Sequence, residues 1–172
     1  ALFLVDGQWP ELRIAEIGVG LIVLGTLALQ VWKRNLPASL TGWALAIAGG
    51  MYIGFPVSSM VRLRAMPGGT SLILIVLLGT WVSDTGAYFV GSAWGRHKLA
   101  PAISPKKSWE GFFGGLLSGI IVVAAMGAWL LNLSWPLGIL LGVLLVIAAT
   151  LGDLAESVIK RQMDCKDSGT LI

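Results

Sequence analysis

Residues 135–156 read WPLGILLGVLLVIAATLGDLAE, an almost unbroken apolar run that ends on two acidic residues, Asp153 and Glu156. A helix needs roughly 20 mostly apolar residues to cross a hydrocarbon core about 30 Å thick. This stretch is long enough, and only its end is polar. It therefore predicts a membrane helix that carries carboxylates where it leaves the apolar layer, and several other segments have the same apolar character.

The composition also indicates a membrane protein. Of the 172 residues, 56% are hydrophobic and only 12% are charged, and the mean hydropathy is +0.83. A soluble domain carries about 25% charged residues, so a water-facing globule of this composition would expose large apolar patches and aggregate. The single cysteine, Cys165, excludes an internal disulfide, and with one histidine there is no zinc-ligand pattern. That histidine, His97, lies in a basic segment and is expected to be incidental.

Five segments have the length and apolar character of membrane helices. They run from about Ile14 to Trp32, Leu40 to Val57, Thr70 to Val90, Trp109 to Leu131 and Trp135 to Gln162. The predicted fold is all-α, a polytopic transmembrane helix bundle that forms a single membrane domain over residues 1–172. Glycine recurs every fourth residue along two segments, which indicates helix faces that pack closely in lipid. These glycines are Gly111, Gly115, Gly119, Gly138 and Gly142.

Basic residues predict the orientation of the chain. With the N-terminus outside, nine Lys and Arg residues lie on the cytoplasmic side and only Arg13, Arg62 and Arg64 lie outside. This bias follows the positive-inside rule. Arg62 and Arg64 are expected in a loop after the second helix, and folding of that loop back against the membrane is an alternative.

Asp84, within the third predicted helix, is the first candidate functional residue. An unpaired carboxylate in hydrocarbon costs on the order of several kcal/mol, so it normally faces a partner inside the bundle. Thr80, Asp84 and Tyr88 share one helical face at steps of four residues. The alternative is an interhelical hydrogen bond or salt bridge that only stabilises packing.

The fifth predicted helix ends in a polar stripe of acidic, hydroxyl and basic side chains. Its members, at steps of three and four residues, are Asp153, Glu156, Ser157, Lys160, Arg161 and Asp164. A solvated helix end with i, i+4 ion pairs would explain the last three. It would not explain Asp153 and Glu156, which directly follow the apolar run. Carboxylates there suit Mg²⁺, which takes oxygen ligands and is commonly shared with substrate phosphates.

The basic segment 95–108 is predicted to be a proline-broken loop on the cytoplasmic side. Its part SPKKS places the hydroxyls of Ser104 and Ser108 beside the ammonium groups of Lys106 and Lys107, just before a helix begins. Lysines, hydroxyls and a helix N-terminus together favour a phosphate. Contact with anionic lipid headgroups is the simpler alternative. Under the predicted topology this loop and both acidic sites reach one leaflet, so they are expected to form one site for a phosphorylated substrate.

Four stretches of the chain resemble motifs of phosphatidate cytidylyltransferases, which are also called CDP-diacylglycerol synthases. They are residues 83–89 (SDTGAYF), 103–111 (ISPKKSWEG), 152–157 (GDLAES) and 157–169 (SVIKRQMDCKDSG), in the order of the family. The last stretch resembles the first part of the family's C-terminal signature. The resemblance covers residues 78–172, whereas the first 70 residues agree only in being hydrophobic.

The resemblance implies an enzyme that transfers CMP from CTP to phosphatidic acid, giving CDP-diacylglycerol and pyrophosphate, with Mg²⁺ as the cofactor. It implies metal ligands at Asp153, Asp84 and Glu156. The residues implied to be catalytic are Asp84, Lys106, Lys107, Lys160, Arg161 and Asp167. Substrate binding falls to Ser104, Ser108, Ser157 and Lys166.

The resemblance also implies partners and a location. CTP, phosphatidic acid and membrane lipids are expected, nucleic acid is not, and the site is expected to face the cytoplasm from a bacterial inner membrane. The glycine faces leave a homodimer open. Because the family signature continues with a Pro-Gly-His-Gly-Gly stretch and an Asp-Arg pair, the sequence is expected to be truncated within that motif and to lack an N-terminal part.

Three alternatives remain from the sequence. A CTP-dependent polyprenol or dolichol kinase would use the same nucleotide to phosphorylate a lipid alcohol. A transporter or channel would line an ion path with Asp84 and Asp153, although charges gathered at one leaflet argue against a path through the membrane. A non-catalytic membrane fragment would only pack with partners.

Overall fold

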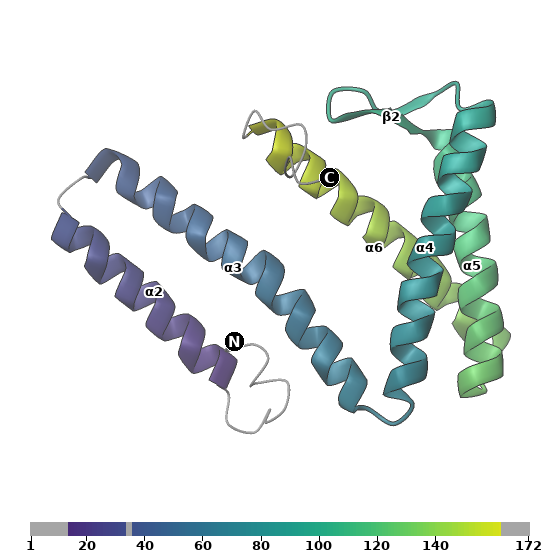
Figure 1. The fold of residues 1–172 in the computed structure, drawn as a ribbon, viewed down its shortest axis with the longest axis horizontal. Helices are drawn as coiled ribbons and strands as arrows, with labels where there is room; N and C mark the ends of the chain where they lie inside the picture. Colours follow the sequence, from purple (N-terminus) through teal and green to yellow (C-terminus); the bar gives the residue numbers. More distant parts are fainter. Residues whose placement is uncertain (1–13, 34–35, 163–172) are drawn as a thin grey trace, which may run out of the picture. The chain divides into compact units, whose positions relative to one another are not determined.

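The structure is a computed structural model that describes residues 14–33 and 36–162. Its helices are α2 (Ile14–Lys33), α3 (Leu36–Ala65), α4 (Gly69–Trp94), α5 (Trp109–Leu131) and α6 (Trp135–Gln162), and the strands β1 (Lys98–Ala100) and β2 (Ser104–Ser108) lie between α4 and α5 (Figure 1). Four of the described helices are long and apolar enough to cross a membrane. The prediction of a polytopic, essentially all-α membrane protein is confirmed. Asp164, Lys166 and Asp167 lie outside the described residues.

The helix boundaries agree with the predicted spans at α5 and α6, and α4 continues about one turn beyond its predicted end. The prediction was wrong for α3, which continues through Pro56, so that Arg62 and Arg64 lie in its last turn and not in a loop. Membrane helices tolerate proline where neighbouring groups adjust the local hydrogen bonding. Next to this proline, the Ser59 hydroxyl donates to the Phe55 carbonyl at 2.9 Å.

The chain divides into two compact units, residues 1–70 and residues 71–172. In the first unit α2 and α3 contact each other as antiparallel neighbours. The second unit contains nearly all of α4, the two strands, α5 and α6. Every described residue with a predicted role in the site belongs to the second unit, so this unit by itself contains the described part of the site.

Glycines allow α4, α5 and α6 to approach each other very closely. A Cβ atom added at Gly115 would lie 2.8 Å from the backbone oxygen of Ser83 in α4, and one at Gly142 would lie 2.8 Å from the Cα of Ile120 in α5. Gly111 and Gly138 have backbone contacts of the same kind, and Gly119 packs against the side chain of Val146. The predicted glycine faces are therefore confirmed as helix contacts, as expected where small residues replace a hydrophobic driving force in lipid.

The segment predicted as a loop contains a β-hairpin, which the prediction missed. Strands β1 and β2 pair antiparallel with Lys98 opposite Ser108 and Ala100 opposite Ser104, and the amide of Ile103 donates to the carbonyl of Ala100 at 3.1 Å in the turn. Pro105 is tolerated because each strand of a two-stranded sheet has an unpaired edge. These short strands show no extended alternation of apolar and polar residues that would have predicted them. Contacts with α5 help to position them.

The glycine contacts lead to a stability prediction. Gly115→Ala is expected to lower the free energy of unfolding by about 1–3 kcal/mol, because the new methyl group overpacks the α4–α5 contact. Gly152→Ala is the matched control, since a Cβ atom at Gly152 would meet nothing within 4 Å. Thermal unfolding in detergent measures both, and equal melting temperatures for the two variants would contradict the packing described above.

Candidate functional site

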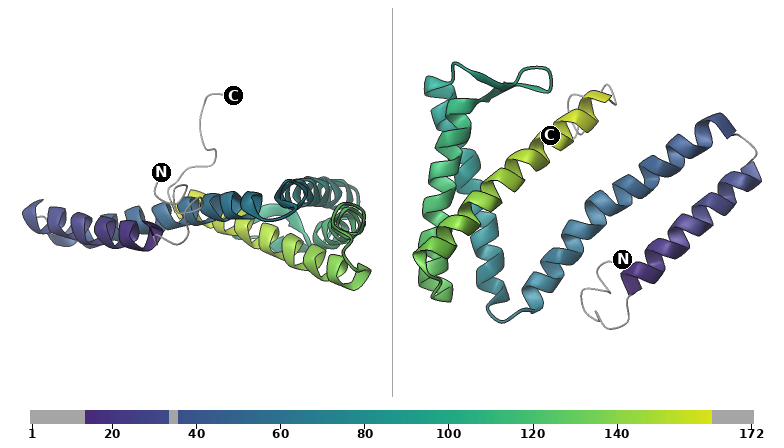
Figure 2. Two further views of the ribbon diagram at one scale, coloured as in Figure 1. Left: turned by 90° about the horizontal axis from the view of Figure 1, so that it is seen from below. Right: turned by 180° about the vertical axis from the view of Figure 1, so that it is seen from behind.

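A cavity of about 450 Å³ lies among α4, the hairpin, α5 and α6. It forms where α6, whose first half packs against α5 at Gly138 and Gly142, diverges from α4 and α5 toward its C-terminal end (Figures 1 and 2). Its polar and charged lining residues are Ser83, Asp84, Tyr88, Ser92, Lys106, Lys107, Ser108, Thr150 and Asp153. Segments that are far apart in sequence therefore contribute both acids and bases to one cavity.

Two carboxylates and a lysine form the charged part of this cavity. The ammonium group of Lys107 on β2 forms an ion pair with a carboxylate oxygen of Asp153 on α6. Asp84 on α4 interacts electrostatically with both of these groups. The Asp153 side chain is 58% exposed, so it keeps access to whatever enters the cavity. The expectation that Asp84, the lysine segment and Asp153 meet at one site is confirmed in the geometry of the described residues.

Ser108 links the hairpin to the start of α5. Its side chain is buried, and its hydroxyl oxygen accepts a hydrogen bond from the amide of Gly111 at 3.2 Å, which caps the helix N-terminus. A Cβ atom at Gly91 on α4 would come within 3.2 Å of the same hydroxyl. Close packing of α4 therefore holds the end of β2, with Lys106 and Lys107 immediately before it, at the cavity.

The other predicted site residues that the structure describes do not line the cavity. Glu156 forms an ion pair with Lys160 at 2.6 Å, one turn apart along α6. Ion pairing at the helix end therefore accounts for Glu156, which was not expected from the sequence. Arg161 donates from Nε to the carbonyl of Ile103 at 3.5 Å, which is a long contact with the hairpin turn. Two predicted substrate-binding residues also lie outside the cavity lining, namely Ser104 and Ser157.

Four polar residues of the cavity were not among the predicted site residues, namely Ser83, Tyr88, Ser92 and Thr150. Ser92 extends the Asp84–Tyr88 face by a further four residues, Ser83 precedes Asp84, and Thr150 precedes Asp153 by three. Helical spacing alone could have identified two of them. Ser92 lies one turn beyond Tyr88 on the face of Asp84, and Thr150 lies about one turn before Asp153. The Thr150 hydroxyl donates to the carbonyl of Val146 at 2.8 Å, so its oxygen remains an acceptor toward the cavity.

Glu110 fastens the hairpin to α5 on the side away from the cavity. Its carboxylate accepts hydrogen bonds from the backbone amides of Arg96 and His97, each at 3.2 Å, and lies 2.6 Å from Nδ1 of His97. The amide of Trp109 donates in turn to the carbonyl of His97 at 2.9 Å. His97, predicted to be incidental, therefore takes part in this structural contact, although it does not line the cavity.

Asp84 and Asp153 are the carboxylates of the cavity that could bind the Mg²⁺ expected from the sequence. Within residues 14–33 and 36–162, no three His, Cys, Asp or Glu side chains gather closely enough to form a metal cluster. Mg²⁺ does not need such a cluster, because it is usually bound through one or two carboxylates together with substrate phosphates and water. Asp84 and Asp153 provide two carboxylates in one cavity, so the residues present fit this mode of binding.

Fold and site together define a polytopic membrane protein with a mixed acidic and basic cavity at one end of its helices. The chain belongs to the cytidylyltransferase family, which its sequence matches over residues 2–172. Relatives named phosphatidate cytidylyltransferase are similar to it along most of its length. The protein from Brucella suis biovar 1 (strain 1330) is 40% identical over 171 residues, which cover 93% of this chain and 58% of the relative.

Two further relatives bear the same name. The protein from Staphylococcus epidermidis (strain ATCC 35984 / DSM 28319 / BCRC 17069 / CCUG 31568 / BM 3577 / RP62A) is 38% identical over 169 residues, covering 96% of this chain and 63% of the relative. The protein from Mycobacterium tuberculosis (strain ATCC 25618 / H37Rv) is 42% identical over 104 residues, covering 60% of this chain and 32% of the relative. The chain thus spans less than two thirds of the length of these relatives.

The contacts of Glu110 predict a local effect on the hairpin. Glu110→Gln should speed hydrogen exchange at the amides of Arg96 and His97, because charge-assisted hydrogen bonds to a carboxylate are stronger than those to a neutral amide. Exchange measured by mass spectrometry on segment 95–108 tests this. The conservative variant Glu110→Asp keeps the charge and should fall between the parent and Glu110→Gln. Unchanged exchange in Glu110→Gln would show that the carboxylate does not hold the hairpin.

Proposed function

We propose that this protein acts as a phosphatidate cytidylyltransferase. A phosphate oxygen of phosphatidic acid would attack the α-phosphorus of CTP, and the bond between that phosphorus and the oxygen that bridges to the β-phosphate would break. CDP-diacylglycerol and pyrophosphate would be the products. The observation that carries this proposal is the single cavity in which Asp84, Lys106, Lys107 and Asp153 meet.

The chemistry of this transfer matches the residues in the cavity. Phosphoryl-type transfer depends mainly on positioning and on stabilising negative charge, and it needs no nucleophilic side chain. Lys106 and Lys107 would neutralise phosphate oxygens of the two substrates. Ser108, whose oxygen already accepts the capping bond, would still donate its hydroxyl proton to a phosphate. Lys160 and Arg161, at the cytoplasmic end of α6, would bind phosphates at the mouth of the site.

Asp84 and Asp153 are the residues that would hold Mg²⁺. Bound there, the cation would neutralise charge on the triphosphate and orient it. The Lys107–Asp153 ion pair keeps the β2 lysine and the α6 carboxylate in contact, so a phosphate that enters the cavity meets a cation and a metal-binding group together. Glu156 would contribute to the metal site only by leaving its pair with Lys160.

The position of the cavity suits one lipid substrate and one water-soluble substrate. It lies at the end of α4 and α6, next to the basic segment 95–108, which carries Arg96, Lys98, Lys106 and Lys107. By the positive-inside rule this basic end would face the cytoplasm, where CTP is found. The similarity to bacterial proteins supports a location in the bacterial inner membrane.

The distribution of label from CTP tests the proposal directly. With the full-length protein in vesicles that contain phosphatidic acid, label at the α-phosphate of CTP is expected in the lipid product, and label at the γ-phosphate is expected in pyrophosphate. A polyprenol or dolichol kinase would transfer only the γ label to the lipid. Transfer of γ label to lipid would overturn the proposal in favour of a kinase, and absence of transfer from either position would favour the transporter or non-catalytic alternatives.

A pair of carboxylate variants tests the assignment of the metal ligands. Asp153→Asn is expected to lower kcat about 10²- to 10³-fold, because it removes a ligand of the Mg²⁺ that would stabilise charge at the reacting phosphates. It should also raise the Mg²⁺ concentration needed for half-maximal activity. Glu156→Gln is the matched comparison on the same helix, and it should change both quantities much less if Glu156 only pairs with Lys160. Normal activity of Asp153→Asn with Mg²⁺ would contradict the assigned role.

A further inference from the structure

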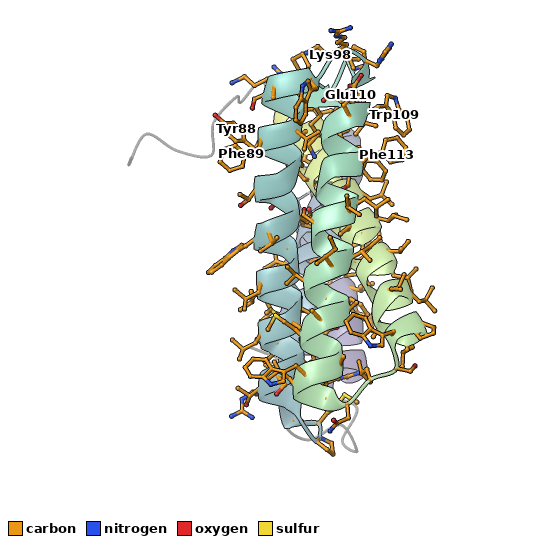
Figure 3. All side chains as sticks on the ribbon, turned by 90° about the vertical axis from the view of Figure 1, so that its right-hand side faces the viewer. Tyr88, Phe89, Lys98, Trp109, Glu110 and Phe113 are labelled. Atoms are coloured by element: carbon orange, nitrogen blue, oxygen red, sulfur yellow. The ribbon has the colours of Figure 1, made fainter. Side chains whose placement is uncertain are left out.

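We propose that the outer face of the hairpin and α5 binds an anionic phospholipid of the surrounding bilayer, at a site separate from the cavity. The outer face is defined by Arg96, Lys98, Trp109 and Phe113. Figure 3 shows Trp109 and Phe113 projecting from the same side of α5, with Lys98 beyond them at the end of the helices. The lipid phosphate would contact the basic residues, and an acyl chain would lie along α5.

The outer face is separated from the cavity by the hairpin and α5 themselves. A shallow hollow on this face is lined by Arg96, His97, Lys98, Trp109, Glu110 and Phe113, none of which lines the cavity. Within β1, Leu99 lines the cavity and Lys98 lines the hollow. On α5, Gly111 and Gly115 line the cavity, whereas Trp109 and Phe113 lie on the other side.

An apolar stripe runs along α5 from the outer face. Trp109, Phe113, Leu117 and Ile121 follow one another at steps of four residues, and their side chains are 46%, 58%, 63% and 58% exposed. Residues at this spacing lie above one another on one helix face. The stripe begins beside the basic residues and extends about three turns along the helix, which is the arrangement of a phospholipid with its head at the interface and its chain in the apolar layer.

The charges beside Trp109, where the stripe begins, favour an anionic headgroup. The side chains of Arg96 and Lys98 are exposed. The one carboxylate of the hollow, Glu110, is already hydrogen-bonded to two backbone amides and to His97. The hollow therefore carries two exposed cationic side chains and one carboxylate, and that carboxylate already has hydrogen-bond partners within the protein. Lys and Arg at a membrane surface attract anionic lipids, and Trp is favoured at the same level.

Tryptophan quenching by brominated lipids tests the proposal without any need for turnover, so its result is independent of the proposed activity. The full-length protein is reconstituted in phosphatidylcholine vesicles that contain either brominated phosphatidylglycerol or brominated phosphatidylcholine. Subtracting the signal of Trp109→Phe isolates the contribution of Trp109. Brominated phosphatidylglycerol should quench it roughly two- to fivefold more effectively than brominated phosphatidylcholine, given the attraction that each basic residue adds.

Two charge variants complete the test. Arg96→Gln with Lys98→Gln should remove the preference for phosphatidylglycerol while leaving quenching by both lipids, because the apolar stripe is unchanged. Arg62→Gln with Arg64→Gln removes the same charge from α3 and should leave the preference intact. Equal quenching by the two lipids in the parent protein would overturn the proposal. Quenching by neither lipid would also overturn it, by showing that a second copy or another protein segment covers the stripe.

Discussion

The close approach of three helix backbones is the constraint on which the site depends. Gly115 packs against the backbone of Ser83, and Gly142 packs against that of Ile120, at distances that no Cβ atom tolerates. In lipid, where the solvent is as apolar as the side chains, such contacts replace the hydrophobic effect as the source of helix association. Because Gly111 and Gly115 also line the cavity, the same small residues that hold α4 against α5 leave room for a ligand beside Asp84.

The ion pair between Lys107 and Asp153 connects parts of the chain that the glycine contacts alone would not join. It links β2, which follows α4, to the polar end of α6, which diverges from the other two helices. Removing charges from water is costly, and a partly buried pair tolerates that cost only when each charge has a partner. The cavity balances carboxylates against lysines, and this charge pattern agrees with membership of the cytidylyltransferase family.

The hairpin separates two surfaces with different chemistry. Toward the cavity it presents Lys106 and Lys107, while on the outer side it is held by Glu110 and presents Lys98. A short hairpin whose two sides carry different residues can serve a reaction site on one side and the bilayer on the other. Binding of a substrate phosphate and binding of a lipid headgroup, which the sequence left as alternatives, are thus proposed for opposite sides of the basic segment.

Several features of this protein were determined by the sequence alone. The apolar runs predicted the spans of α5 and α6, the four-residue spacing predicted the glycine faces, and the four motifs predicted the family. Apolar runs and helical steps are local properties, which a helix in lipid expresses whatever its neighbours are. The position of Asp153 at the end of an apolar run also marked it as a residue that ion pairs along its own helix do not explain, and it pairs with Lys107 on β2.

Only the tertiary structure decided which members of each polar stripe face the cavity. Helical spacing placed Asp153 and Glu156 on one stripe, yet Asp153 reaches Lys107 while Glu156 pairs with Lys160 along its own helix. The divergence of α6 from α5 decides between these partners, and no periodicity in a single helix encodes the angle at which it meets another. The hairpin was missed for the same reason, since its short strands depend on α5 and on Glu110 and not on a pattern of their own.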